Sequence, residues 1–323
     1  MKVLVTGGAG YLGSVITQKL LDNGYKVVVL DKLIFNQLSL LSYTSNPNFK
    51  FVYGDVRDTN LLKKLVDECD IIIPLAAIVG FPACDADPKL AYEINFEQIK
   101  NIVDWTRGSS KKILYPNTNS GYGVGENGVY CDETSPLNPI SVYGKTKVDA
   151  EKYISENTDG ICFRLATVFG VSSRMRVDLL VNDFTYKAIT DKYIVVFERN
   201  FKRNFIHIKD VASAFIFMIE NYDRYKGEVF NVGLSDANLS KKELLEKIQT
   251  YVKDFAVSYN DYYEDPDKRD YIVSNEKIEK TGWKPEWNLD KGIEELIHAY
   301  KMIVPKMGAE FRNGFPLGYA NNT

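Results

Sequence analysis

The stretch VTGGAGYLGS, residues 5–14, places Gly7, Gly10 and Gly13 at three-residue intervals directly after an apolar run. The apolar run is typical of a buried strand, and the residues after it have the spacing of a helix. Glycines between a strand and a helix allow a tight turn and let backbone amides approach a pyrophosphate at the positive helix end. The stretch therefore predicts a dinucleotide-binding loop rather than a plain glycine turn.

Short β-branched runs alternate with helical patterns through the first half of the chain. This alternation predicts an α/β fold with a Rossmann-like, doubly wound parallel sheet that binds ligands at the carboxyl ends of its strands. The expected strands lie at 2–6, 26–30, 50–54, 70–76, 111–116 and 161–165. The expected helices lie at 11–22, 58–68, 88–107 and 142–156.

The regular alternation ends near residue 170, which indicates a second region of different architecture. We expect residues 1–170, together with about 205–235, to form the dinucleotide-binding domain. Residues 171–204 and 236–323 are expected to form a smaller mixed α/β C-terminal region that binds substrate.

Composition narrows the classes of partner. The chain has 323 residues, a net charge of −3 and a pI near 5.7, so it has no overall attraction for nucleic acid or anionic membranes. Its four cysteines are scattered without metal-ligand spacing, so neither a metal site nor a disulfide framework is expected. No run approaches the roughly 18 apolar residues of a membrane span, and the first residues do not resemble a secretory leader. We expect a cytoplasmic protein.

The residues after the second and third strands indicate which dinucleotide binds. Asp31 closes the second strand, where a carboxylate accepts hydrogen bonds from the adenosine ribose. A 2′-phosphate would be repelled there, which favours NAD over NADP, although neighbouring Lys32 weakens this preference. The sequence GDVRD follows the third strand, so Asp55 and Val56 are expected to flank the adenine.

A tyrosine and a lysine lie four residues apart in YGKTK, at the start of the expected helix 142–156. Two residues at this spacing share a helix face, which by itself is compatible with a purely structural pair. Next to NAD, however, hydride transfer needs a base for the substrate hydroxyl. The Lys147 ammonium and the positive cofactor ring would both favour the phenolate of Tyr143. Thr118 is a candidate to orient the substrate oxygen.

Several motifs in this order resemble the extended short-chain dehydrogenase/reductase family, in its NAD-dependent epimerase/dehydratase branch. They are TGGAGYLG, Asp31, GDVRD, LAA at 75–77, Asn95, TNSGYG, YGKTK and RNFIHIKDV. The resemblance implies that Thr118, Tyr143 and Lys147 form the catalytic triad. The expected cofactor contacts are Gly7, Gly10, Tyr11, Leu12, Gly13, Asp31, Asp55, Val56, Leu75, Ala76, Ala77, Asn95, Tyr143 and Lys147.

The same resemblance implies a nucleotide-sugar substrate, whose two phosphates need local arginines in a chain of net negative charge. Arg174 is a further candidate, and for each arginine a solvated surface position is the alternative. Thr167 stands where relatives commonly carry an asparagine, which puts one phosphate contact in doubt. The expected substrate contacts are Thr118, Asn119, Ser120, Tyr143, Arg176, Asn182, Arg203 and Arg269.

Departures from the family pattern narrow the reaction. Family dehydratases carry an acidic pair after the catalytic threonine, where this chain has Asn119 and Ser120, so 4,6-dehydration is not expected. Cys84 either reaches the active site or is a small packed residue, and we interpret His207 as a packed core histidine.

These observations predict an NAD-dependent oxidoreductase acting on carbon 4 of a UDP- or GDP-linked hexose or heptose in surface polysaccharide sugar biosynthesis. A 4-epimerase and a 4-dehydrogenase both fit the residues. A 4-keto-sugar reductase and a non-catalytic NAD-binding regulator remain alternatives. By the resemblance, helices 90–107 and 142–156 form a homodimer interface, although their apolar stripes also suit packing against the sheet.

Overall fold

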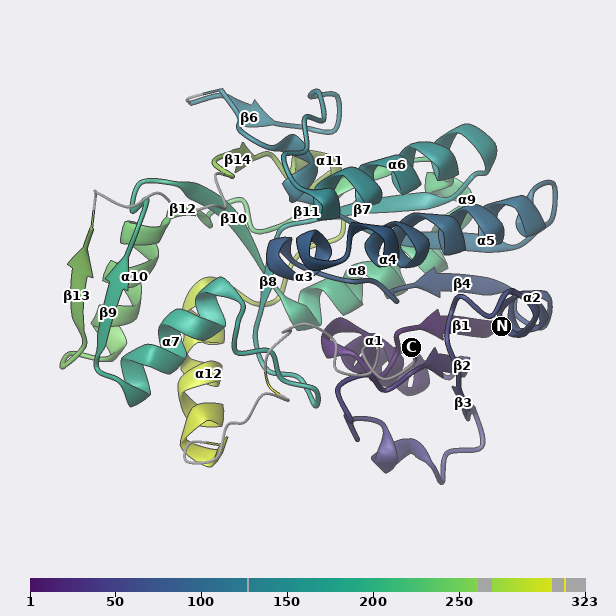
Figure 1. Ribbon diagram of the computed structural model, residues 1–323, viewed down its shortest axis with the longest axis horizontal. Coiled ribbons are helices and arrows are strands. Elements are labelled where there is room, and N and C mark those ends of the chain that lie inside the picture. Colours follow the sequence, from purple (N-terminus) through teal and green to yellow (C-terminus); the bar gives the residue numbers. More distant parts are fainter. Residues whose placement is uncertain (127, 261–268, 304–310, 312–323) are drawn as a thin grey trace.

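The computed structural model describes residues 1–126, 128–260, 269–303 and 311. Its main feature is a parallel sheet of seven strands in the order β11-β7-β5-β4-β1-β2-β3 (Figure 1). This order confirms the predicted doubly wound sheet, and it places the reversal of strand order, where such folds bind ligands, between β1 and β4. The strands are β1 (Lys2–Thr6), β2 (Lys26–Asp31), β3 (Phe49–Tyr53), β4 (Ile71–Pro74), β5 (Lys112–Thr118), β7 (Ile161–Leu165) and β11 (Val229–Val232).

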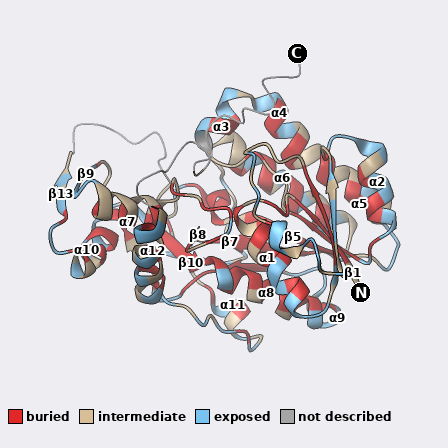
Figure 2. Cartoon of the chain, turned by 90° about the horizontal axis from the view of Figure 1, so that it is seen from below, coloured by how far each residue is buried: buried red, intermediate tan, exposed pale blue. Residues whose placement is uncertain are grey.

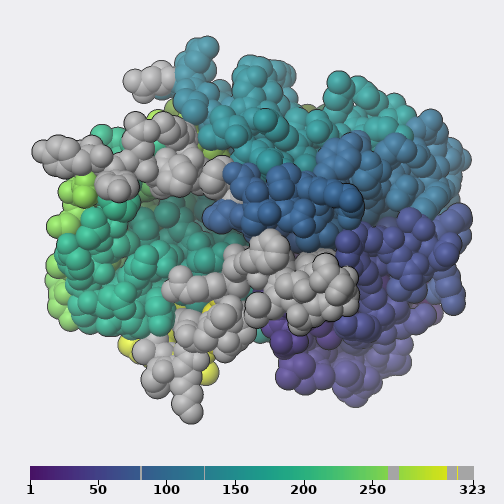
Figure 3. Space-filling model, viewed as in Figure 1, coloured from purple at the N-terminus to yellow at the C-terminus, as the bar shows by residue number. Residues whose placement is uncertain are grey.

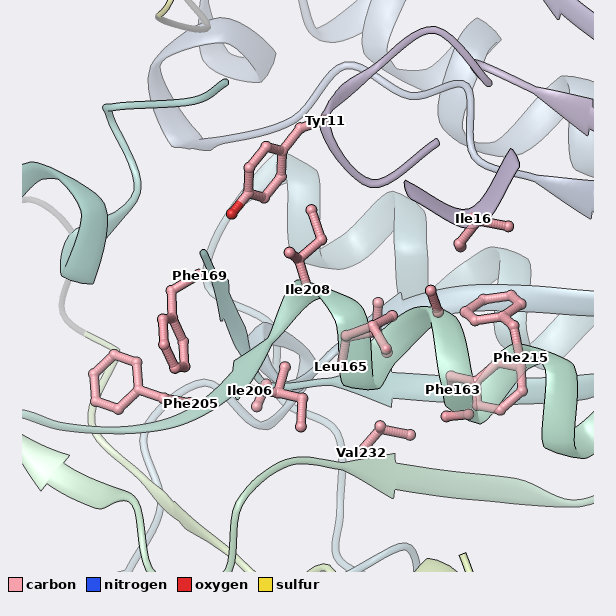
Figure 4. Packing of buried hydrophobic residues seen from close by; sticks show 14 of the residues in the cluster. Tyr11, Ile16, Phe163, Leu165, Phe169, Phe205, Ile206, Ile208, Phe215 and Val232 are labelled. Atoms are coloured by element: carbon pink, nitrogen blue, oxygen red, sulfur yellow. The ribbon is translucent and has the colours of Figure 1, made fainter. Parts of the chain in front are cut away.

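Helices cover both faces of the sheet (Figures 1 and 2). Side chains alternate along β1, so that Val3 and Val5 join one core cluster while Leu4 joins the other. Figure 4 shows Phe163 of β7 and Phe215 packed together in the first of these clusters. α1 (Tyr11–Asp22) and α8 (Ile208–Glu220) belong to that cluster, and α2 (Thr59–Asp67), α5 (Gln98–Thr106) and α6 (Val142–Asn157) belong to the second.

The single helix expected at 88–107 is interrupted. It consists of α4 (Pro88–Tyr92), the π-helical turn η2 (Glu93–Glu97) and α5. Apolar spacing predicts a continuous helix here, because the pattern of side chains does not report a local change from i+4 to i+5 backbone hydrogen bonds. The turn carries Asn95, and π-turns within helices often occur at functional sites.

The second part of the molecule is built from small sheets and three longer helices. Of the stretch 205–235 expected to return to the main sheet, α8 and β11 do so, whereas β10 pairs with β8 and β12. The chain continues from β7 into β8, beyond the carboxyl end of β7. β10 lies there beside β8, and it therefore does not join the main sheet. The small sheets contain β8 (Thr167–Phe169), β10 (Lys202–His207) and β12 (Asn238–Ser240), then β9 (Tyr193–Val196) and β13 (Ala256–Tyr259), and finally β6 (Tyr130–Cys131) and β14 (Ile272–Val273).

The three longer helices of this part are α7 (Leu180–Thr190), α10 (Lys241–Tyr251) and α12 (Leu289–Ile303). Residues 261–268, 304–310 and 312–323 of the expected substrate region lie outside the described residues. Short helices complete the structure: η1 (Leu41–Tyr43), α3 (Phe81–Ala86), η3 (Asn119–Tyr122), α9 (Tyr222–Tyr225) and α11 (Glu276–Glu279). Within the described part of the chain, the helices are too short or too polar for any of them to traverse a bilayer.

Candidate active site

A cavity of about 790 Å³ is lined by both parts of the molecule. Figure 3 shows these parts side by side on one face, with the cofactor part mainly purple and blue and the substrate part mainly teal and green. Three predicted site residues, Asn95, Asn119 and Asn182, are not in the lining. The predicted residues that line it are Gly7, Gly10, Tyr11, Leu12, Gly13, Asp31, Asp55, Val56, Leu75, Ala76, Ala77, Thr118, Ser120, Tyr143, Lys147, Arg176, Arg203 and Arg269.

The glycine loop at one end of the cavity has no room for side chains. Gly7 has a φ of +67°, and a Cβ there would lie 2.7 Å from the backbone nitrogen of Ala76. A Cβ at Gly13 would lie 2.2 Å from the carbonyl oxygen of Gly7. Helix α1 begins directly after Gly10, which offers no capping side chain. The loop therefore fits a pyrophosphate placed against the positive end of α1.

Asp31 lies at the carboxyl end of β2, beside this loop. Its Oδ2 accepts a hydrogen bond from the Ala9 amide at 2.9 Å, and its Oδ1 accepts one from the Leu33 amide at 2.8 Å. Burial raises the pKa of Asp31, and these amides oppose the rise. Lys32, expected to weaken the preference for NAD, places its Nζ 3.1 Å from the carboxylate of Asp55. The arrangement fits an adenosine ribose with a free 2′-hydroxyl.

The three predicted catalytic side chains come from the end of β5 and the first turns of α6. Ser141 caps α6, because its hydroxyl accepts a hydrogen bond from the Gly144 amide at 3.1 Å. Thr118 accepts a hydrogen bond from the amide of Ser120 at 3.1 Å, and the Thr118 hydroxyl opposes the rise that burial causes in the pKa of Tyr143. Both side chains line the cavity, and Lys147 lies one turn beyond Tyr143 on α6.

The electrostatics of the pair differ from the expectation. Burial raises the pKa of Tyr143 to about 12, and the largest opposing charges are those of Arg269 and Arg176, not that of Lys147. The Lys147 ammonium lies 4.1 Å from the centre of the ring of Tyr115, a residue of β5. The ring attracts the ammonium and so holds its positive charge close to β5. Burial lowers the pKa of Lys147 to about 7, so this group can exchange protons near neutral pH.

A buried charged network lies directly behind the triad and was missed from the sequence. Glu151, one turn beyond Lys147, lies 2.7 Å from Nη2 of Arg164 on β7. The same carboxylate accepts a hydrogen bond of 2.5 Å from Asn117, the neighbour of Thr118 on β5. The network therefore fixes β5, α6 and β7 relative to one another. The continuation of the Tyr143 and Lys147 spacing to Glu151 is the signal that could have indicated it.

Four arginines line the cavity, and the three predicted as diphosphate ligands come from separate segments. Arg176 forms a 2.5 Å ion pair with Asp178, ahead of α7. Arg203 on β10 is almost fully buried, with its guanidinium over the ring of Tyr271. Arg269 donates a hydrogen bond to the hydroxyl of Ser120. The predicted diphosphate ligands are thus gathered around the triad from positions far apart in the sequence.

The three asparagines outside the lining are buried. Asn95 holds the loop after β4, since its side chain accepts from the Ile78 amide at 2.8 Å and donates to the Ile78 carbonyl at 3.0 Å. Asn182 accepts from the Gly170 amide at 3.0 Å and donates to the backbone of Arg176. The amide atoms of Asn119 have no hydrogen-bond partner among the described residues. Asn95 and Asn182 therefore act on the site through the loops they hold.

Two residues with alternative interpretations are now placed. Cys84 is fully buried with its thiol 3.3 Å from the Ile78 carbonyl, and burial raises its pKa to about 12, so it is a packed neutral thiol. His207 is fully buried, stacks on Trp287 and has its Nε2 2.9 Å from Glu295. This position agrees with the interpretation of His207 as a packed histidine.

Comparison with known proteins gives the family. Residues 3–233 match the NAD dependent epimerase/dehydratase family. A putative UDP-glucose 4-epimerase of Methanocaldococcus jannaschii is 28% identical over 93% of this chain and 98% of the relative. The low-salt glycan biosynthesis protein Agl12 of Haloferax volcanii is 29% identical, again over 93% and 98%.

Among solved structures, the UDP-glucuronic acid 4-epimerase of Bacillus cereus, in complex with UDP-glucuronic acid and NAD, has the same fold. The TM-score is 0.83 at 24% identity, over 94% of this chain and all of that structure. The glycine loop, the carboxylate of Asp31 and the family match agree on the cofactor. The chain belongs to the NAD dependent epimerase/dehydratase family, and its cofactor is NAD.

Proposed function

We propose that this enzyme oxidises carbon 4 of a nucleotide-diphosphate sugar, as a 4-epimerase or a 4-dehydrogenase, in the biosynthesis of surface polysaccharide sugars. One observation carries the proposal. Thr118 and Tyr143 line the same cavity as the glycine loop and the three arginines predicted to hold the diphosphate. The proposal therefore puts the NAD that accepts the hydride, the tyrosine that accepts the proton and the arginines that bind the diphosphate in one cavity.

Each group has a defined task in this proposal. Thr118 orients the hydroxyl at carbon 4. Tyr143 accepts its proton as the phenolate, a form that the positive ring of bound NAD and the charges of Arg269 and Arg176 favour. NAD, when bound, accepts the hydride. Burial lowers the pKa of Lys147 to about 7, so its amine exchanges protons with Tyr143 during turnover. Arg176, Arg203 and Arg269 hold the diphosphate by charge-assisted hydrogen bonds.

The residues after Thr118 support oxidation over dehydration. Dehydration needs groups that protonate the leaving hydroxyl and remove a carbon-bound proton. Asn119 has no carboxylate, and the Ser120 hydroxyl is engaged by Thr118 and Arg269. The names of the M. jannaschii and B. cereus relatives, both 4-epimerases, support carbon 4 as the reacting position.

We extend the proposal to domains, assembly and location. Residues 1–170 with about 205–235 hold the cofactor, and 171–204 with 236–323 hold the sugar nucleotide. The outer face of α4, η2 and α6 carries an aromatic cluster. In it Tyr92 is 43% exposed, and the centres of the Tyr92 and Phe96 rings are 5.0 Å apart. We infer that this face pairs with a second copy as a homodimer, in the cytoplasm.

The test is to incubate the purified protein with UDP-, GDP- and dTDP-sugars while following NADH absorbance and product mass. A product lighter by two hydrogens identifies a dehydrogenase, and an isomer of unchanged mass identifies an epimerase. Reduction of a 4-keto sugar with no reverse oxidation would identify a reductase. No reaction across the panel, with NAD bound, would contradict catalysis and favour a regulator.

A further inference from the structure

Residues 170–174, between β8 and α7, pack against the beginning of α1. The Tyr11 hydroxyl donates to the Gly170 carbonyl at 2.8 Å, and Figure 4 shows this hydroxyl directed toward the strand that carries Phe169. The Ser172 hydroxyl donates to the Tyr11 carbonyl at 2.7 Å and lies 2.9 Å from the Ser14 hydroxyl. This segment of the substrate part therefore touches the helix end at which the cofactor pyrophosphate is expected.

Arg174, at the end of this segment, is a buried cation. It is 4% exposed, and its guanidinium lies 4.3 Å from the centre of the Phe35 ring. Its Nε and Nη2 atoms have no hydrogen-bond partner among the described residues. Burial lowers the pKa of Arg174 to about 10, with a smaller contribution from Arg176, so it remains charged at neutral pH. A buried charge without a partner is costly, which indicates that a ligand completes this position.

Two other cations that line the cavity have carboxylate partners. Arg176 pairs with Asp178 at 2.5 Å, and Lys187 pairs with Asp183 at 2.7 Å. Arg174 forms no such ion pair within the described part of the chain. Asp31 and Asp178 act on it only as more distant charges. Arg174 is therefore a buried guanidinium of the cavity that has no carboxylate counter-ion within the described part of the chain.

We propose that Arg174 binds the pyrophosphate of the dinucleotide cofactor, with the Phe35 ring as its platform. Two sources of diphosphate reach this cavity, and the surroundings favour the cofactor. Phe35 follows β2 on the adenosine side of the cavity, and the segment that carries Arg174 is anchored on Tyr11. By contrast, Arg203 and Arg269 contact Tyr271 and Ser120, on the substrate side.

This contact would join three elements through the cofactor. Phe35 belongs to the loop after β2, Arg174 comes from the segment that leads into α7, and the pyrophosphate would lie between them and α1. The inference rests on NAD binding and needs no assumption about the sugar. Its consequence is that the substrate part supplies a cofactor ligand, so bound NADH should hold the segment 170–176 and the loop 32–40 together.

The experiment compares wild type with Arg174→Met after removal of bound cofactor, by calorimetric titration. The probes are NADH, ADP-ribose and adenosine. Loss of a charge-assisted contact should weaken NADH and ADP-ribose by about 10- to 100-fold, while adenosine, which has no phosphate, should bind equally to both proteins. Equal NADH affinity in the two proteins, or an equal loss for adenosine, would overturn the proposal.

Two further measurements separate ligand binding from a structural role. Without cofactor, Arg174→Met should be at least as stable to urea as wild type, since an unpaired buried charge is removed. Lower stability without cofactor, together with unchanged NADH affinity, would make Arg174 structural. Arg174→Lys, which retains the charge but not the planar fork, should bind NADH with intermediate affinity and serves if the methionine variant does not fold.

The matched control is Arg176→Met, two residues along the same segment. UDP and GDP serve as probes of the substrate diphosphate site. Arg176→Met should weaken one of these nucleotides and leave NADH unchanged, whereas Arg174→Met should do the reverse. If Arg174→Met weakened UDP or GDP alone, Arg174 would belong to the substrate site and the proposal would fail. Because the readouts are binding and stability, absence of sugar turnover would not affect the outcome.

Discussion

The cofactor part and the substrate part line one cavity, but they build their surfaces in different ways. The cofactor part uses backbone shape, because Gly7 and Gly13 have no space for a Cβ and α1 begins directly beside them. The substrate part uses charge, with Arg203 and Arg269 supplied by segments far apart in the sequence. We therefore expect changes near the sheet to affect stability or cofactor, and changes among the arginines to affect substrate affinity.

The sharpest test lies where the two parts meet. Tyr143→Phe removes the proposed proton acceptor while keeping the ring, so turnover should fall by about 10²- to 10⁴-fold. The affinities for NADH and for a nucleoside diphosphate should both remain within about twofold, measured by titration. Tyr53→Phe is the control, since Tyr53 is 68% exposed on β3. Near-normal turnover in Tyr143→Phe would end the proposed mechanism.

The second test concerns the rigidity of the cofactor part. Glu151→Ala leaves the buried guanidinium of Arg164 without its carboxylate, which should lower the free energy of unfolding by about 3–5 kcal/mol. Asp67→Ala removes a carboxylate from an exposed pair with Lys63, and should change stability by about 0.5 kcal/mol or less. Urea unfolding of both variants makes the comparison. Equal losses would show that the buried network does not stabilise the site.

The same contrast explains which features the sequence predicted. The sheet, its helices and the glycine loop follow from local patterns, because apolar runs and glycine spacing are set by neighbouring residues. The Tyr143 and Lys147 motif is local as well. The i+4 spacing places Glu151 on the helix face of Lys147, but no local pattern links that helix face to its partner Arg164 on β7. The network was therefore missed.

Interactions across the cavity were also beyond the sequence. Lys147 was expected to act on Tyr143, but its ammonium lies over Tyr115, whose position depends on the packing of β5 against α6. Arg174 is one of the candidate diphosphate ligands, and its stacking on Phe35 depends on packing that no local pattern reports. Both arrangements arise from contacts between residues far apart in the chain.

The third test is confined to the substrate part. Arg269→Ala removes a cation that lines the cavity and contacts Ser120, so the KM for the sugar nucleotide should rise by about 10- to 100-fold. NADH affinity should not change. Lys242→Ala, in an exposed pair with Glu246 on α10, is the control and should alter neither quantity. Steady-state kinetics with NADH titration measures both. Equal loss of substrate and cofactor would move Arg269 out of the substrate site.

The smallest expected effect tests how the substrate part is attached. The carboxylate of Glu295 on α12 contacts the side chains of His207 and Lys209 and accepts a hydrogen bond from the Val171 amide. Burial alone would raise the pKa of Glu295, but these contacts outweigh it and lower the pKa to about 2. A carboxyl with a lower pKa in the folded state stabilises the protein above its unfolded value, near 4.5, and loses that contribution as the pH falls toward 2.

Wild type should therefore lose about 2 kcal/mol of stability from this group between pH 6 and pH 3, and Glu295→Gln should lose less over the same range. Urea unfolding at several pH values measures the difference. Because Glu295 also holds Val171, beside the segment that carries Arg174, the glutamine variant should loosen NADH slightly at neutral pH. If acid weakened both proteins equally, Glu295 would not be the link between α12 and the cofactor end of the cavity, and the two parts would be joined elsewhere.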